Sequence, residues 1–328
     1  METPDFTFVV DHPIRRICED GEQGAARNTR EIASRIAEIH LLAMDSNPLL
    51  HAQFPTAESL ANLCRFLVDP YEAVLASEYT SLLAQDLGST ADELGDGGIL
   101  VARKSAPSQQ APGGAELGEI VGFATWEYSP GAEAAPSHHG SDSRDENANS
   151  AHKLETEISN HVEGCRKEYL DTYARLSTEA KETCFGGQEC YRGLSIEISF
   201  VCTDPRYQGK GAGSALTRKV LELAQQGPRL SGRRTKLPVY LESTLLAVPM
   251  YERLGFKALG SFEMKIPSSS KSSPSKLPHS RVGESSSTKD GGGIHIDPTL
   301  PDVSLSTDST DERSSMITYK EICMVWHP

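Results

Sequence analysis

The sequence predicts an α+β fold in which helices and strands alternate along the chain. Segments with apolar residues every three or four positions, typical of amphipathic helices, are followed by short apolar runs typical of strands. A glycine-rich turn between one of these strands and the next helix supports the same interpretation. We expect a single domain over residues 1–328 that carries flexible insertions.

Three segments are the expected insertions. Residues 267–315 contain fifteen serines and no Phe, Tyr or Trp. Residues 105–118 and 129–150 have a similar polar composition. Such segments bury too little apolar surface to offset the entropy lost on ordering. The apolar fraction of the whole chain, 38%, is low for a globular protein and agrees with this division.

The ordered part before residue 190 is expected to be mostly helical. Its expected elements are a strand at 6–10, a helix carrying Ile32, Ile36, Ile39 and Leu42, a helix from Thr56 to Leu67, a helix at 71–83, strands at 99–103 and 120–128, and one long helix over 151–183.

The second half alternates more regularly. The expected order is a strand at 194–203, the glycine-rich turn at 208–213, a helix at 214–226, a strand at 239–243, a short helix at 247–254, a strand at 256–266 and a last strand at 317–326. We expect the last two strands to pair, with the serine-rich insertion between them.

Charge and composition exclude several classes of protein. The 32 Lys and Arg residues against 46 Asp and Glu give a net charge of −14, which disfavours binding to nucleic acid. No apolar run approaches the roughly 18 residues needed to span a membrane. Residues 1–5 resemble no secretory signal, so we expect a cytoplasmic protein, with a nuclear location also open.

Metal binding is not expected either. The seven cysteines lack the paired spacing of a zinc site, and we interpret them as free thiols. His138 and His139 lie near two aspartates, but in a segment of this composition they are expected to be solvated.

The glycine-rich turn is the most informative motif. It reads Gln208-Gly209-Lys210-Gly211-Ala212-Gly213-Ser214 and opens directly into a helix. Glycines allow positive φ and the close approach of a ligand, and the N–H groups at a helix N-terminus favour an anion. We therefore expect a phosphate or pyrophosphate here. A P-loop is excluded because no Lys-Ser or Lys-Thr follows at its spacing. A dinucleotide fold, with Glu242 as its acidic residue, remains an alternative that predicts a parallel sheet.

Two blocks resemble the GCN5-related N-acetyltransferase (GNAT) family. Gln208-x-x-Gly211-x-Gly213 is similar to the family signature for the cofactor turn, and residues 248–256 resemble its second block. The resemblance covers about 194–264. It implies a mostly antiparallel sheet whose two central strands splay apart around acetyl-CoA as co-substrate.

The resemblance also implies which residues serve the site. Backbone groups of Val201, Cys202 and Thr203 would pair with the pantetheine arm. The turn would hold the pyrophosphate through Gln208, Gly209, Lys210, Gly211, Ala212, Gly213 and Ser214. Tyr251 would be the general acid that protonates the CoA thiolate. Thr244 stands where many members have an asparagine that contacts the pantetheine.

Glu197 is the candidate general base. It lies eleven residues before Gln208, where the histone-acetylating members carry their catalytic glutamate. Strand alternation would place Glu197, Ser199 and Val201 on one face and Ile196, Ile198 and Phe200 on the other. A glutamate that only bonds a neighbouring element is the alternative interpretation.

The expected acceptor is a primary amine, either a small molecule or a basic peptide. The acidic net charge favours cationic substrates through long-range steering. Asp45 is a candidate for attracting the amine, although Asp45-Ser46-Asn47-Pro48 is equally a turn sequence. A non-catalytic protein that binds acyl-CoA on the same scaffold also remains open.

Overall fold

A seven-stranded sheet forms the centre of the molecule. The computed structural model describes residues 7–13, 21–86, 97–105, 118–129, 150–186, 194–227, 229–230, 233–268 and 315–328. The strand order is β1-β2-β3-β4-β7-β9-β8. The strands are β1 (Phe8–Asp11), β2 (Gly97–Lys104), β3 (Ile120–Ser129), β4 (Ser195–Thr203), β7 (Val239–Thr244), β8 (Lys257–Pro267) and β9 (Met316–Trp326), with β5 (Arg229–Leu230) and β6 (Arg233–Arg234) forming a separate pair.

Every neighbouring pair in this sheet is antiparallel except β4 and β7. The mixed, mostly antiparallel sheet expected from the sequence is therefore confirmed. The parallel sheet that the dinucleotide alternative requires is not the sheet of this molecule. The pairing expected between the strands on either side of the serine-rich segment is also confirmed, because β8 and β9 pair from Lys257 to Pro267.

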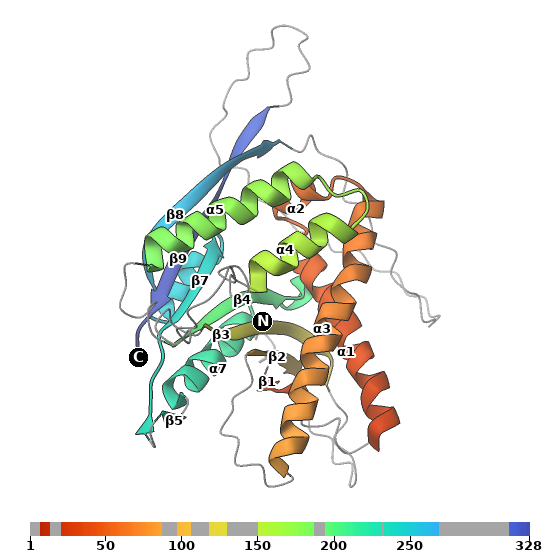
Figure 1. Cartoon of the computed structure of the whole chain (residues 1–328), viewed down its shortest axis with the longest axis vertical. Coiled ribbons are helices and arrows are strands. Elements are labelled where there is room, and N and C mark those ends of the chain that lie inside the picture. Colours follow the sequence, from red (N-terminus) through yellow and green to blue (C-terminus); the bar gives the residue numbers. More distant parts are fainter. Residues whose placement is uncertain are drawn as a thin grey trace, which may run out of the picture.

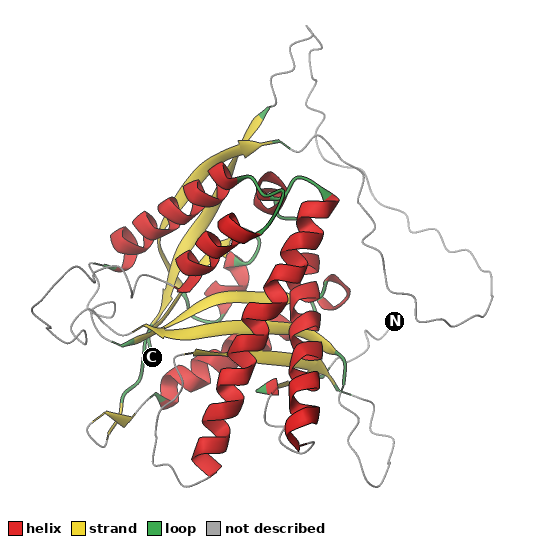
Figure 2. Ribbon diagram, turned by 45° about the vertical axis from the view of Figure 1, so that its right-hand side comes forward, coloured by secondary structure: helices red, strands yellow, loops and turns green. Residues whose placement is uncertain are grey.

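Helices cover both faces of the sheet (Figures 1 and 2). On one face, α1 and α3 run side by side against β2–β4, and α5 lies across β8 and β9. The opposite face packs against α7 and α8. The helices are α1 (Gly21–Met44), α2 (Pro48–Gln53), α3 (Ala57–Asp86), α4 (Ser150–His161), α5 (Lys167–Phe185), α7 (Ala212–Gln226) and α8 (Val248–Arg253), with a 3-10 turn, η2 (Pro205–Tyr207).

The two helices expected at 56–67 and 71–83 are one helix, so that expectation is wrong. Helix α3 continues through Pro70, although proline removes a hydrogen bond and normally costs about 3 kcal/mol in a helix. Leu67, Tyr71 and Leu75 follow one another at intervals of four residues, and all three are buried. Burial of this continuous stripe against α1 compensates for the proline.

The long helix expected at 151–183 is also wrong, because it is two helices. Helix α4 ends at His161 and α5 starts at Lys167, with Gly164 between them at φ 79°. The backbone turns there, and Arg166 N–H bonds the carbonyl of Gln53 in α2. The short helix α2, which begins with Asn47 as its N-cap, was not expected at all.

A β-bulge changes which side chains of β4 share a face. Thr125 pairs with Phe200 but Trp126 pairs with Ile198, so Ser199 has no opposite residue. Beyond the bulge, Phe200 packs on the α1–α3 side, whereas Val201 packs on the α7 side with Ile198. The strict alternation expected from the sequence is therefore wrong after residue 198, and Val201 does not share the face of Glu197.

The strands β4 and β7 separate immediately after the bulge begins. Their parallel pairing is limited to Ile196–Ile198 against Val239–Leu241. Strand β4 then continues to Thr203 and β7 to Thr244 without pairing to each other. The expected splay of the two central strands is thus present.

Most of the expected insertions lie outside the described residues. These are residues 106–117, 130–149 and 269–314, and they include His138 and His139. In the part of the chain that is described, no helix is long and apolar enough to cross a membrane.

Candidate active site

The turn after β4 exposes backbone to an approaching ligand. Gly209 and Gly211 have φ values of 73° and 95°, a region that other residues rarely adopt. A Cβ built on either glycine would meet no atom within 4 Å. Gly211 is the N-cap of α7, and no side chain caps the helix there. The first turn of α7 is therefore available to an anion.

Gly213 joins three elements at the base of this turn. A Cβ at this position would lie 3.4 Å from Met250 Sδ of α8, 3.6 Å from Thr203 Oγ1 and 3.7 Å from Val201 Cγ1. Gln208 closes the turn from the other side, because its side-chain amide donates to the carbonyl of Thr203 at 3.1 Å. The glycine turn is thus fixed directly to the end of β4.

An ionic network holds the same turn from behind. Asp204 is 1% exposed, and it accepts hydrogen bonds from the Arg206 backbone at 3.0 Å and from the Arg35 guanidinium at 2.6 Å. Burial alone would raise the pKa of Asp204, but the hydrogen bonds from Arg206 and Arg35 outweigh it and lower this pKa to about 2. Arg35 also donates to the carbonyl of Ile120 at 3.2 Å, so the network ties α1 and β3 to the turn.

A cavity of about 230 Å³ opens where β4 and β7 separate. We name it the central cavity. Its wall includes residues from α1, α2, α3, α4, α5 and α8 as well as β4, β7 and β9. The apolar part includes Leu49, Leu50, Phe54, Leu63, Leu67 and Leu170. The polar part includes Lys181, Glu197, Glu242, Thr244, Tyr251, Tyr319 and Glu321.

Tyr251 enters this cavity from α8. The residue is 5% exposed, and its ring packs edge-on against Phe256 at a centroid distance of 5.5 Å. Burial, with a smaller contribution from Cys202, raises the pKa of Tyr251 well above its ordinary value. Among the described residues no hydrogen bond engages the Tyr251 hydroxyl. The phenol is therefore protonated at neutral pH and has its proton available.

Glu197 is held by two neighbours. One carboxylate oxygen accepts from the Lys181 ammonium of α5, and the other accepts from the Tyr240 hydroxyl at 3.1 Å. Both members of the ion pair are buried. Burial alone would lower the pKa of Lys181, but Glu197 and Glu242 outweigh it and raise this pKa above its ordinary value.

Two further carboxyls complete the polar wall. Glu321 accepts from the hydroxyls of Tyr319 and Tyr173, the latter at 3.0 Å. Glu242 Oε2 accepts from Ser177 at 2.8 Å, while its buried Oε1 has no hydrogen-bond partner among the described residues. Burial raises the pKa of Glu242 to about 7, against the opposing effect of Lys181. Burial also raises the pKa of Glu321.

His40 lines the opposite wall and is neutral. Its Nδ1 lies 2.6 Å from the Tyr71 hydroxyl, and its ring is 4.6 Å from that of Phe200. Burial lowers the pKa of His40 to about 4. The histidine therefore adds no positive charge to the cavity at neutral pH.

The structure brings together most of the residues that the sequence singles out. Val201, Cys202, Thr244, Glu197 and Tyr251 all line the central cavity. The glycine turn, from Gln208 to Ser214, adjoins it through the end of β4. Asp45 is different: it lies 56% exposed beside His51, and it is not part of the cavity wall.

Several residues of the cavity were not expected from the sequence. One face of α5 carries three of them at intervals of four residues: Tyr173, Ser177 and Lys181. Their polar groups lie at positions where the helical pattern calls for apolar side chains. Glu321 is a buried acid in β9, where it follows the buried Tyr319 and precedes the buried Cys323. Polar residues at core-facing positions are the signal that points to this site.

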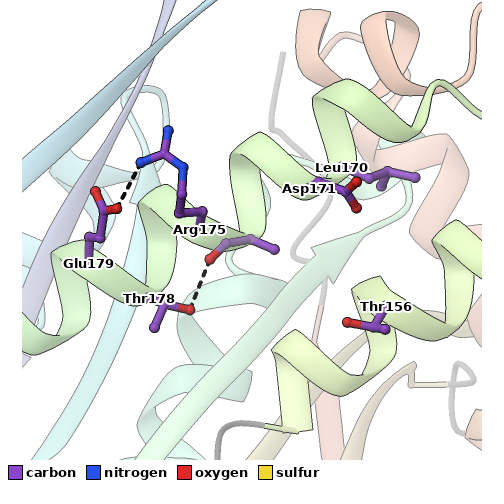
Figure 3. Close-up of a pocket in the computed structure, with 7 residues that line it drawn as sticks. Thr156, Leu170, Asp171, Arg175, Thr178 and Glu179 are labelled. Atoms are coloured by element: carbon purple, nitrogen blue, oxygen red, sulfur yellow. Dashed lines mark hydrogen bonds and ion pairs between the residues drawn. The ribbon is translucent and has the colours of Figure 1, made fainter.

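A second hollow lies between α4 and α5 and is of a different kind (Figure 3). Arg175 pairs with Glu179 at 2.7 Å, and Thr178 bonds the carbonyl of Ala174 at 2.9 Å. These three polar groups have their partners within one helix. Within the described residues, no group of three His, Cys, Asp or Glu side chains is arranged to hold a metal ion.

Comparison with known proteins finds a family match over part of the chain. A model of the acetyltransferase (GNAT) domain matches residues 173–258, a stretch that contains Lys181, Glu197, the glycine turn and Tyr251. Residues 173–258 are therefore similar in sequence to a GNAT acetyltransferase domain. The resemblance described from the sequence is thereby confirmed.

The similar proteins are distant in sequence. An uncharacterized N-acetyltransferase of Schizosaccharomyces pombe is 37% identical over 62 residues, which are 19% of this chain and 23% of that protein. The chain therefore matches less than a quarter of the length of this curated relative.

Two solved structures are similar at low levels. A polyamine N-acetyltransferase of Drosophila melanogaster is 12% identical, with coverage of 98% of this chain and 100% of its own and a TM-score of 0.42. A histone acetyltransferase HPA2-related structure from Corynebacterium glutamicum is 17% identical, with coverage of 79% and 88% and a TM-score of 0.34. The family assignment rests on residues 173–258 and not on these structures.

Proposed function

We propose that this chain is an N-acetyltransferase that moves the acetyl group of acetyl-CoA to a primary amine by direct attack. One observation carries the proposal: β4 and β7 pair only over Ile196–Ile198 and then separate over a cavity that contains Tyr251. The uncapped start of α7 and the open glycines lie at the end of the same strand. These features fit a ligand with a thioester at one end and phosphates at the other.

Acetyl-CoA, when bound, supplies the thioester carbonyl that the amine attacks. The residues of the chain then have separable tasks. The glycine turn would bind the diphosphate, and the free edge of β4 at Val201–Thr203 would orient the connecting arm. Tyr251 would hold a proton at its phenol oxygen and deliver it to the leaving sulfur.

Glu197 remains our candidate for the proton acceptor, acting through water. Its ion pair with Lys181 places it firmly in the cavity wall and keeps its orientation fixed. A fixed carboxylate at this position would assist the loss of a proton from the incoming ammonium. Because the Glu197 carboxylate is held in one orientation, we expect most of the rate gain to come from the positioning of the reacting groups.

The first experiment compares thermal unfolding of the protein with acetyl-CoA, CoA and NAD. A ligand at about 100 times its dissociation constant adds roughly 2.7 kcal/mol of stability. We expect acetyl-CoA and CoA, but not NAD, to raise the melting temperature. Turnover is then measured as free thiol released in the presence of an amine panel. Binding without turnover would favour the non-catalytic alternative, and stabilisation by none of the three would remove the proposal.

Replacement of Tyr251 tests the mechanism. Tyr251→Phe removes the proton donor but keeps the ring packing, so we expect turnover to fall by about 10²–10⁴. The acetyl-CoA-induced rise in melting temperature should be retained. Tyr128→Phe is the matched control, because Tyr128 on β3 has a buried hydroxyl without a hydrogen-bond partner among the described residues and does not line the cavity. Full activity in Tyr251→Phe would exclude Tyr251 as the acid.

A further inference from the structure

The wall of the central cavity contains more carboxyl groups than basic side chains. The ionisable carboxyls in its wall are those of Glu197, Glu242 and Glu321, and the cation among the described lining residues is Lys181. Lys181 contacts Glu197 directly. His40 is neutral, and within the described part of the chain Lys181 lowers the pKa of Glu242 and Glu321 from nearby but forms its ion pair with Glu197.

The hydrogen bonds of these two carboxyls are unequal. Both oxygens of Glu321 accept from tyrosine hydroxyls, whereas Glu242 receives one bond from Ser177 and its buried Oε1 receives none. A buried acceptor without a donor costs free energy, and more when the group is charged. A ligand that brings an N–H donor and a positive charge would relieve both costs.

The two carboxyls are also close enough to act together. Strands β7 and β9 are antiparallel neighbours in which Glu242 pairs with Cys323 and Thr244 pairs with Glu321. Glu242 and Glu321 therefore stand diagonally on one face, a separation of roughly 7 Å between Cβ atoms in sheets of this kind. Burial, with a smaller contribution from Glu321, raises the pKa of Glu242 to about 7.

The rest of the cavity restricts the size and character of the ligand. Its volume of about 230 Å³ lies below the roughly 300–1,000 Å³ of sites for drug-sized ligands. Leu49, Leu50 and Phe54 add an apolar part to its wall. A short hydrocarbon chain with a charged end fits this combination, whereas an extended peptide does not.

We propose that Glu242 and Glu321 form a cation subsite, and that the acceptor is a small diamine whose second ammonium group binds there. The inference rests on the proposed acetyltransferase function and names its substrate class. One amino group would lose a proton, attack the thioester and become the amide, with CoA leaving as the thiol. The other ammonium group would stay intact between the two carboxylates. The groups that face Glu242 are Lys181 and Ser177 from α5, Glu197 from β4, and Glu321 and Cys323 from β9.

The test compares 1,4-diaminobutane with 1-aminobutane in the wild-type protein and in Glu242→Gln. One charge-assisted hydrogen bond corresponds to about a 10- to 100-fold preference. We expect wild-type kcat/KM to favour the diamine by this factor and the ratio to fall toward one in Glu242→Gln. Glu263→Gln is the matched control, because Glu263 is an exposed acid of β8 that pairs with Lys320 outside the cavity. It should keep the wild-type ratio.

Calorimetric titration of both amines separates this inference from the proposed function. Tighter diamine binding that is lost in Glu242→Gln supports the subsite even where no turnover occurs, and in that case only the transferase proposal fails. Equal binding and equal kcat/KM of the two amines in the wild-type protein would overturn the subsite. If Glu242→Gln does not fold, Glu321→Gln carries the same comparison, since its side chain keeps an oxygen for the tyrosine hydroxyls.

Discussion

The glycine turn and the central cavity lie side by side along β4 and are built in opposite ways. The turn presents backbone groups, and the charges behind it are paired: Asp204 has both Arg35 and Arg206. The cavity presents side chains from distant parts of the chain, and one of its carboxylate oxygens, on Glu242, lacks a donor. The paired charges behind the turn need nothing from the ligand, so they hold the turn in place for the diphosphate. The unpaired oxygen of Glu242 can instead be satisfied by a ligand that brings an N–H donor.

The largest effect is expected from removing the cation of the central cavity. Lys181→Met leaves the buried Glu197 carboxylate without its cation, and the removal of one partner from a buried pair costs about 3–5 kcal/mol. We expect urea unfolding at pH 7 to show a loss of this size. Stabilisation by acetyl-CoA should persist in whatever fraction stays folded.

A double variant provides the control for that prediction. Glu197→Gln in the Lys181→Met background removes the orphaned charge, so most of the lost stability should return. A double variant that is as unstable as Lys181→Met alone would show that packing of the lysine stem, and not its charge, is what matters.

A smaller effect is expected on the other side of the comparison. Asp204→Asn weakens the charged hydrogen bonds from Arg35 and Arg206 and should cost about 2 kcal/mol at pH 7. Because the pKa of Asp204 is lowered to about 2 from its ordinary 3.8, this contribution is present above pH 4 and is lost as the pH falls toward 2. Unfolding measured from pH 2 to 6 should show the two proteins converging at the acid end.

The exposed Asp69 supplies the control for Asp204. It pairs with Arg30 on the surface of α3, so Asp69→Asn should change stability by less than about 1 kcal/mol and show no convergence of this kind. A pH-independent deficit in Asp204→Asn would mean that the carboxylate charge is not what holds the turn.

The smallest effect is expected at Glu78, a carboxyl that also lacks a hydrogen bond to one oxygen. Glu78 of α3 bonds the Ile99 N–H, has a buried Oε2 without a partner among the described residues, and does not line the central cavity. Burial raises its pKa to about 7 from 4.5, so the fold loses stability as the pH rises from about 4.5 to 7 and loses no more above that. Glu78→Gln should therefore gain roughly 1 kcal/mol at pH 7 relative to pH 6. Activity should be unchanged in Glu78→Gln. A loss of turnover would contradict our distinction between Glu78, outside the central cavity, and Glu242, in its wall.

The same contrast explains what the sequence could and could not predict. The glycine turn, α7 and the strand before them depend on local rules of φ, capping and alternation, and all three are found where the sequence places them. The Lys181–Glu197 pair and the Tyr319–Glu321 contact join residues whose approach depends on tertiary packing. Local patterns do not contain that information.

The errors in the helices have a similar origin. Pro70 is a local signal for a boundary, but the buried stripe of Leu67, Tyr71 and Leu75 overrides it. Between α4 and α5 the apolar spacing looks continuous, yet Gly164 adopts a left-handed conformation and the chain turns. In both cases the contacts with neighbouring elements decide the outcome.

The bulge at Ser199 has a consequence for how β4 tolerates change. Side chains alternate between the two faces of the sheet both before and after Ser199. Because Ser199 is an extra residue, the α7 side is reached by Ile196 and Ile198 before it and by Val201 after it. Saturation mutagenesis of β4 should therefore require apolar residues at 198 and 201, three positions apart. Deletion of Ser199 would remove the bulge and leave a single alternation, with Ile198 and Val201 still toward α7 and Phe200 and Cys202 still toward α1.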